Sequence, residues 1–235
     1  MYTNEIFLED YKVPSECFLW ISINKPLKVD FWQKQIEYVE DKFSKIIVLI
    51  ADEIDTINQI NIEWKSYEEA LKSTQAKFFL WKSFLEKRIK DVAKKKKDSE
   101  LWYEWVKNKF TFVSREDISW TERFLMLYNL LKSEFVKEGR FRYNVHEILS
   151  NYLKARWKES MVSDDLLDKL SDYILKELVT LIDWIDVDGV NYSCIVYPTF
   201  KETIWGMNKL AEKLYKTMDK WLNLRGNVLI ESSFG

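Results

Sequence analysis

Two short runs near the start of the chain are apolar almost throughout. They lack the alternation of apolar and polar residues that is typical of a half-buried strand. The first covers Cys17 to Asn24, with Ser22 as a polar interruption near its end, and the second covers Ile46 to Ala51. Between them, apolar residues recur every three or four positions from Val29 to Phe43. The pattern predicts a strand, a helix and a second, parallel strand whose faces are both covered. The chain therefore begins as an α/β fold.

The rest of the chain is dominated by helical patterns. Ser66 and Glu69 have the spacing of a capping box, which predicts a long helix from about Tyr67 to about Lys97. Ser119 with Glu122, Asn144 and Ser163 are the predicted starts of later helices. Further helices are predicted over residues 101–107, 119–138, 144–158, 164–184 and 201–222, strands over 109–113 and 190–197, a turn over 186–189 and a tail from 225. These elements predict one α/β domain over residues 1–235 with a helix-rich middle.

The composition is that of a folded protein, with 47% hydrophobic residues, five Gly and three Pro. No apolar run approaches the length of a membrane span, and residues 1–10 lack the pattern of a signal peptide. Cys17 and Cys194 both lie in strand-like runs, so we expect buried free thiols. We therefore expect a cytoplasmic protein that does not contact a membrane.

Histidine is almost absent, since His146 is the only one in the chain. This leaves almost no material for a Ser-His-Asp triad or for a histidine-rich metal site. We interpret His146 itself as a structural or surface residue. No metal or cofactor is expected.

The net charge of −2 hides a strong asymmetry. Residues 72–97 hold ten basic residues against two acidic ones, a local charge of +8 that leaves −10 for the remainder. A lysine-rich helix is often no more than a solvated surface, but the scarcity of acidic residues favours a track for a phosphate backbone. The ten basic residues are Lys72, Lys77, Lys82, Lys87, Arg88, Lys90, Lys94, Lys95, Lys96 and Lys97.

Candidate chemistry lies at the ends of predicted strands. Ligands of open α/β sheets bind at the carboxyl ends of the strands, so Ser22 is a candidate nucleophile, although a serine there is more often a turn residue. Tyr173 and Glu177 stand four apart and share one face of a helix. Tyr197 ends the last predicted strand and is followed by Pro198. Each of these features also occurs in proteins where the residue only packs.

Taken together, their order and spacing resemble the cyclodipeptide synthase family, which makes cyclic dipeptides from two aminoacyl-tRNAs. The resemblance runs from about Phe18 to about Leu214 and implies a single Rossmann-type domain with a mostly parallel sheet, similar to class I tyrosyl- and tryptophanyl-tRNA synthetases. It implies Ser22 as the nucleophile, Tyr173 with Glu177 as the helical pair, and Tyr197 as the strand tyrosine. The basic helix matches the tRNA-binding helix of the family.

The resemblance also implies a reaction path and a set of pocket residues. Ser22 is expected to carry first an aminoacyl and then a dipeptidyl group, with Glu177 and Tyr173 holding the ammonium and Tyr197 transferring a proton. No DNA is expected as a partner. A downstream enzyme that modifies the cyclic dipeptide is an expected partner. The residues expected to line the substrate pocket are Phe18, Trp20, Lys25, Thr180, Leu181, Ile195 and Pro198.

Three positions bear on the subgroup and the substrate. Pro198 after Tyr197 resembles the subgroup of the family with proline at that place, and Lys25 differs from the asparagine that marks the other subgroup. The family usually has glycine two residues before the nucleophile, where this chain has Trp20. Because residues two apart in a strand face the same side, we expect the Trp20 indole beside Ser22, where it reshapes or partly fills the first aminoacyl pocket.

Other functions remain open at this point. A non-catalytic tRNA- or RNA-binding module would keep the basic helix but would not need Ser22, Glu177 or Tyr197. A protein-interaction module would present the same helix to an acidic partner. An unrelated serine hydrolase is less favoured, because the chain lacks a Gly-x-Ser-x-Gly turn. An ATP-dependent synthetase is disfavoured because neither the His-Ile-Gly-His nor the Lys-Met-Ser-Lys-Ser pattern occurs.

Overall fold

A five-stranded parallel sheet lies at the centre of the fold, with the strand order β3-β2-β1-β6-β7. The chain builds outward from β1 in one direction through β2 and β3, and later in the other direction through β6 and β7. The order therefore reverses at β1, and the carboxyl ends of β1 and β6 flank this switch point. The strands are β1 (Glu16–Ser22), β2 (Lys45–Ala51), β3 (Phe110–Val113), β6 (Cys194–Pro198) and β7 (Val228–Ser232).

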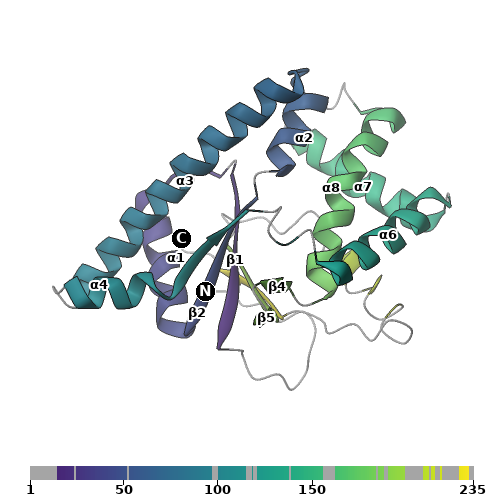
Figure 1. Ribbon diagram of the computed structural model, residues 1–235. Helices are drawn as coiled ribbons and strands as arrows, with labels where there is room; N and C mark the ends of the chain where they lie inside the picture. The colour runs from purple at the N-terminus through teal and green to yellow at the C-terminus, as the bar shows by residue number, and fades with distance from the viewer. Residues whose placement is uncertain are drawn as a thin grey trace.

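Helices cover both faces of the sheet (Figure 1). α1, α3 and α4 lie on one side, and α6, α7 and α8 lie on the other, while α2 follows the carboxyl end of β2. The predicted α/β fold with a largely parallel, doubly covered sheet is therefore confirmed. The helices are α1 (Val29–Lys42), α2 (Glu53–Asn61), α3 (Tyr67–Lys96), α4 (Glu100–Lys107), α6 (Glu122–Val136), α7 (Arg140–Ala155) and α8 (Asp164–Ile182).

The computed structural model describes most, but not all, of the chain. The described residues are 15–23, 25–51, 53–96, 100–114, 118, 121–137, 139–155, 162–183, 185–187, 190–198, 209–211, 213–214, 218 and 228–232. The predicted helix over 201–222 and the predicted cap Ser119 therefore lie largely or wholly outside them. Lys97 and Asn24 lie outside them as well.

The apolar runs of the sequence divide between two hydrophobic clusters. In β1, Leu19 and Ile21 pack in the cluster under α1 and α3, whereas Phe18 and Trp20 pack in the cluster under α6, α7 and α8. Each of these four residues is at most 4% exposed. Successive side chains of a strand point to opposite faces, so a strand covered on both faces needs apolar residues at every position.

The predicted caps at Ser66 and Ser163 are confirmed. The backbone N–H of Ser66 donates to Glu69 Oε2 at 3.1 Å, and the N–H of Glu69 donates to Ser66 Oγ at 3.3 Å, which is the predicted capping box of α3. Ser163 caps α8 as predicted, through its Oγ and the N–H of Leu166. Helix α6 instead takes its cap from Thr121, whose hydroxyl accepts from the N–H of Phe124, so the prediction of a Ser119 cap is wrong.

Other predictions about the elements need correction. Helix α2 was not predicted, and α7 begins at Arg140 rather than near Asn144. The predicted strand over 190–197 is two strands interrupted at Ser193. Its first part, β5 (Val190–Tyr192), pairs antiparallel with β4 (Ile185–Val187) in a separate small sheet, so part of the predicted turn is a strand. The predicted tail contains β7, which pairs with β6.

Two absences hold for the part of the chain that the structure describes. None of its helices combines the length and the apolar character needed to cross a membrane. Nor does any group of three His, Cys, Asp or Glu side chains there come close enough together to hold a metal ion. His146 is a structural residue as predicted, since its Nε2 lies 2.8 Å from Asp168 Oδ1 and its ring packs beside Phe135.

The two cysteines provide a test of the core. Both are free and buried, as predicted, and burial raises the pKa of the Cys194 thiol to about 12 and that of Cys17 well above its usual value. The thiolate is the reactive form, so we expect neither cysteine of the folded protein to react with a thiol reagent at mildly alkaline pH. Both should react in concentrated guanidinium chloride. Labelling of the native protein at the rate of the denatured chain would contradict this arrangement.

Candidate functional site

The carboxyl end of β1 turns back toward β6. The backbone N–H of Lys25 donates to the carbonyl oxygen of Ser22 at 3.0 Å, which closes a tight turn directly after the strand. Ser22 is half-buried, and it is the last residue of a strand that is otherwise apolar except for Glu16 at its start. The register pairs Leu19 with Val196, so Ser22 and Tyr197 both lie at the carboxyl ends of adjacent strands.

Lys25 joins the two strand ends. Its Nζ lies 3.8 Å from the centroid of the Tyr197 ring and donates a hydrogen bond to the carbonyl oxygen of Pro198. A lysine ammonium over an aromatic face is attracted by the ring quadrupole. The backbone of Ser22 and the side chains or carbonyl groups of Tyr197 and Pro198 are thus linked through Lys25, and we call these four residues the strand-end cluster. It combines a hydroxyl, a phenol and an ammonium at the switch point of the sheet, where ligands of α/β folds bind.

Helix α8 lies on the same face of the sheet. Tyr173 is buried in the hydrophobic cluster that also holds Trp20 and Ile195, and Tyr197 packs against this cluster. Glu177 is half-buried one turn after Tyr173. The structure thus places Tyr173, of the predicted helical pair, and Tyr197, of the strand-end cluster, in the same hydrophobic cluster on the α8 side of the sheet.

The predicted pocket residues on this face are almost all buried. Trp20 is 4% exposed and shares the α8 side of the sheet with Ser22, as predicted for residues two apart in a strand. Its indole occupies part of the volume that a glycine would leave open. Phe18, Leu181 and Ile195 are buried in the same cluster, and Thr180 and Pro198 are buried as well.

A cavity of about 390 Å³ lies between the start of α6 and the end of α8. Thr180 lines it, together with Val179 and Phe124. The ion pair between Arg123 and Asp183 forms part of its wall, and Asp183 is 2% exposed. Thr180 also donates from its hydroxyl to the carbonyl oxygen of Glu177 at 2.7 Å, which fixes its rotamer. Sequence reasoning missed Arg123 and Asp183, because their 60-residue separation carries no local signal.

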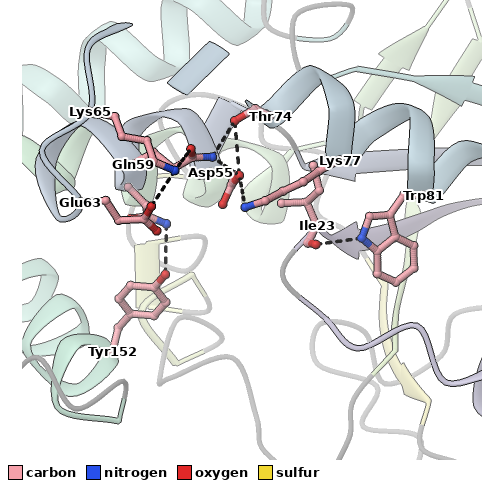
Figure 2. Close-up of polar contacts among 10 residues, drawn as sticks. Ile23, Asp55, Gln59, Glu63, Lys65, Thr74, Lys77, Trp81 and Tyr152 are labelled. Carbon is pink, nitrogen blue, oxygen red and sulfur yellow. Dashed lines mark hydrogen bonds and ion pairs between the residues drawn. The ribbon is translucent and has the colours of Figure 1, made fainter. Parts of the chain in front are cut away.

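A polar network that sequence reasoning missed anchors α3 to the carboxyl edge of the sheet (Figure 2). The carboxylate of Asp55 in α2 is 4% exposed and accepts from Gln59 at 2.6 Å, from Thr74 at 3.3 Å and from Lys77 at 2.7 Å. Trp81 donates from its indole N–H to the carbonyl oxygen of Ile23 at 2.8 Å. Helix α3 is therefore attached both to α2 and to the residue that follows Ser22.

A second link runs from α2 to the predicted helical pair. Asn58 donates from Nδ2 to the Tyr152 hydroxyl at 3.1 Å, and the Tyr152 ring packs edge-on against Tyr173 with 6.3 Å between centroids. Asn58 is 6% exposed. Asp55, Asn58 and Gln59 have the three- and four-residue spacing of one helix face. This spacing is a signal for helix α2 in the sequence. The residues that have it are polar, however, so the pattern does not indicate a buried helix face.

Some of the basic residues predicted to form a track on α3 are engaged in ion pairs, whereas others are not. Lys77 pairs with Asp55, and the buried Arg88 pairs with Asp91. Lys95 pairs with Glu37 of α1, and Lys96 contacts both Glu40 and Asp41 of α1. Apart from Asp91, which lies in α3 itself, the acidic partners are thus supplied by other elements. Lys82 is half-buried, whereas the exposed members without an ion pair to a described residue are Lys72, Lys87, Lys90 and Lys94.

Comparisons by sequence find no relatives. No protein-family model matches the chain, and no curated protein is detectably similar to it.

The fold has clear counterparts among solved structures. A cyclodipeptide synthase from Bacillus thermoamylovorans matches with a TM-score of 0.66 at 17% identity, over 92% of this chain and 87% of that one. A cyclodipeptide synthase from Streptomyces noursei matches with a TM-score of 0.59 at 14% identity, over 93% and 95% of the two chains. Tyrosyl-tRNA synthetase from Archaeoglobus fulgidus, complexed with L-tyrosine, matches with a TM-score of 0.53 at 12% identity, over 94% of this chain and 56% of that one. The predicted likeness to both groups is confirmed at the level of the Rossmann-type fold.

The Asp55 network should contribute strongly to stability. Asp55→Ala leaves the Gln59 amide, the Thr74 hydroxyl and the Lys77 ammonium without their shared acceptor, so we expect the free energy of unfolding to fall by about 3 kcal/mol. Glu63→Ala is the matched control, because Glu63 forms an exposed ion pair with Lys65 and should change stability by less than about 0.5 kcal/mol. Urea unfolding measures both. Equal effects of the two substitutions would mean that the network does not anchor α3.

Proposed function

We propose that this protein joins two aminoacyl groups, each delivered as an ester on tRNA, into a cyclic dipeptide. The observation that carries the proposal is the strand-end cluster at the switch point of a fold shared with cyclodipeptide synthases. An aminoacyl ester is already activated, so the reaction needs no nucleotide hydrolysis and little catalytic machinery. A serine, a phenol, a carboxylate and correct positioning are sufficient in principle.

In the first step, Ser22 Oγ attacks the carbonyl carbon of the first aminoacyl ester. The bond from that carbon to the ribose oxygen breaks, and the serine proton passes to the departing ribose oxygen. The vicinal ribose hydroxyl or a tyrosine serves as the relay, since the chain offers no nearby histidine of the triad type. The product is an aminoacyl group esterified to Ser22.

In the second step, the amine of the group on Ser22 attacks the ester of the second aminoacyl-tRNA. A dipeptide esterified to Ser22 requires this direction, because attack in the opposite sense would release Ser22 and leave the dipeptide on tRNA. The bond to the second ribose oxygen breaks, and a dipeptide remains esterified to Ser22. Glu177 and Tyr173 hold the ammonium of the first group before it loses its proton, through charge-assisted hydrogen bonds.

In the third step, the free amine of the dipeptide attacks the Ser22 ester and closes the diketopiperazine ring. The amine loses a proton and Ser22 regains one, and Tyr197 transfers it. Lys25 fixes the ring of Tyr197 and the carbonyl oxygen of Pro198, so it acts as a positioning residue for this transfer. The proposal is supported by the short Lys25–Tyr197 approach across two strand ends.

Trp20 bears on which amino acid is accepted first. Its buried indole, on the same strand face as Ser22, leaves less space beside the nucleophile than glycine would. We propose that the first side chain is directed away from Trp20 toward Thr180 and Leu181. The same burial favours the second candidate function, a tRNA-binding module that performs no chemistry. The two candidates differ in whether Ser22 is needed.

The direct test is to express the chain in a bacterial host and to search the medium for cyclic dipeptides by mass spectrometry. We expect a diketopiperazine with the parent chain and none with Ser22→Ala, because the alanine variant has no nucleophile. Ser133→Ala, at an exposed serine of α6, is the matched control and should leave the yield unchanged. Well-folded parent protein that binds tRNA but yields no cyclic dipeptide with any charged tRNA offered in vitro would support the binding module instead.

A second prediction concerns Lys25. Lys25→Met removes both the cation over the Tyr197 ring and the donor to Pro198, and cation–π contacts of this kind contribute about 1 kcal/mol. We expect the rate of product formation to fall about tenfold or more. Lys25→Arg should recover part of it, since a guanidinium also binds an aromatic face. Lys34→Met, at an exposed position of α1, is the control. An unchanged rate with Lys25→Met would exclude the positioning role.

A further inference from the structure

Helix α2 carries a buried amide whose oxygen has no partner. Asn58 is 6% exposed, and its Nδ2 donates to the Tyr152 hydroxyl at 3.1 Å. Its Oδ1 is buried as well, but no hydrogen-bond donor in the described part of the chain reaches it. Among the described residues, it is the one buried side-chain carbonyl or carboxylate oxygen without a donor. An atom of this kind destabilises the fold, so its presence requires an explanation.

The other polar residues on this side of α2 have their partners. Asp55 accepts from three donors. The amide of Gln59 is bound at both ends, since its Nε2 donates to Asp55 at 2.6 Å and its Oε1 accepts from Lys65 at 2.8 Å. The fold therefore supplies partners for the buried polar atoms of Asp55 and Gln59 but not for the oxygen of Asn58.

Asn58 lies beside residues that the proposed function uses. Tyr152 accepts from the Asn58 amide at its hydroxyl, and its ring packs edge-on against Tyr173. Tyr152 and Tyr173 are 7% and 8% exposed, so this group is as deeply buried as Asn58 itself. Helix α2 packs directly against α8, the helix that carries Tyr173 and Glu177 (Figure 1). The unpaired oxygen thus belongs to the same buried region as the helical pair.

The chemistry of an ammonium group calls for an acceptor in this region. An ammonium has three N–H donors, and a buried charged group is stable only when its donors are bound. The proposed function provides two acceptors for the first aminoacyl group, the carboxylate of Glu177 and the hydroxyl of Tyr173. A third acceptor is needed once the substrate is enclosed, and the oxygen of Asn58 is a buried acceptor without a donor.

We propose that Asn58 Oδ1 accepts the third hydrogen bond from the ammonium of the first aminoacyl group. The inference rests on the proposed function, because it assigns a further binding residue for the same substrate. Tyr152 is then a positioning residue, since its hydroxyl binds the amide nitrogen and so fixes the orientation of the Asn58 oxygen. The site that results selects esters that carry an α-amine over otherwise identical esters that carry an α-hydroxyl group.

A purely structural role for Asn58 makes a different prediction. In that case the only function of the amide is its hydrogen bond to Tyr152. Replacement of both partners by apolar groups of similar shape, in Asn58→Leu/Tyr152→Phe, leaves no polar atom of the pair unbound and should keep the fold intact. Any effect on the reaction would then be the same for every ester. Binding of the ammonium instead predicts a loss that is limited to substrates with an amine.

The test compares the acylation of the protein by two probes. One is bulk bacterial tRNA charged with a mixture of labelled amino acids. The other is the same preparation after nitrous acid has converted the α-amino groups into hydroxyl groups. The rate at which label becomes attached to the protein is measured, and Ser22→Ala, which lacks the proposed nucleophile, gives the background.

We expect Asn58→Leu/Tyr152→Phe to slow acylation by aminoacyl-tRNA about tenfold or more, because a hydrogen bond to a charged group is lost. Acylation by hydroxyacyl-tRNA should not be slowed. Asn58→Asp should retain the preference for the amine, since a carboxyl oxygen is also an acceptor. Asn129→Leu makes the same change at an exposed position of α6 and is the matched control. Urea unfolding of the double variant should give a midpoint no lower than that of the parent.

Each outcome decides the proposal. A loss limited to aminoacyl-tRNA in the double variant, with recovery in Asn58→Asp, supports the contact. Equal slowing with both probes, or no slowing, overturns it and leaves Asn58 with a structural role. Failure of the folded parent to become acylated by either probe would instead contradict the proposed function. Filter binding of the two tRNA preparations then decides the inference separately: a preference for aminoacyl-tRNA that the double variant loses supports the contact, and equal binding overturns it.

Discussion

Complete burial of β1 is the constraint on which the rest of the structure depends. The strand is paired on both edges and covered on both faces, so charged or polar side chains between Cys17 and Ile21 would lose hydration without gaining partners. Polar chemistry can begin only where the strand reaches the edge of the sheet. Ser22 is at that point, and the turn to Lys25 brings an ammonium back over the neighbouring strand. The same constraint thus creates the core and locates the candidate site.

The second determinant is the way α3 is held. Trp81 fixes the helix to the turn after β1, and Lys77 fixes it to the buried carboxylate of Asp55 in α2. Near its far end, Lys95 and Lys96 are bound by acidic residues of α1. These contacts use the inner and lateral cations of the helix and leave the outer ones to solvent. Helix α3 is therefore fixed to the rest of the fold both near its middle and near its C-terminal end.

The site differs in character from an ordinary hydrolase. It contains no histidine, and its charged group at the strand end is a lysine that contacts an aromatic ring and a backbone carbonyl. A lysine with these two contacts orients its neighbours. This suits the proposed reaction between activated esters and amines, in which the principal requirement is to hold reactants together while water is kept away. The buried Trp20 adds to the exclusion of water on the same strand face.

The sequence by itself determined the elements whose patterns are local: the two apolar strands, the capping box at Ser66, the helix cap at Ser163, and the positions of Ser22 and Tyr197 at strand ends. It did not reveal α2, because the buried face of that helix is polar and is satisfied by Thr74, Lys77 and Tyr152, which are distant in the chain. Nor did it reveal that most of the inner lysines of α3 are neutralised by acids on other elements, or that Lys25 contacts Tyr197 across two strand ends. Periodicity and capping depend on residues within a few positions of each other, so a sequence displays them. Ion pairing and buried hydrogen bonding depend on which distant segments meet, and only the tertiary structure decides that.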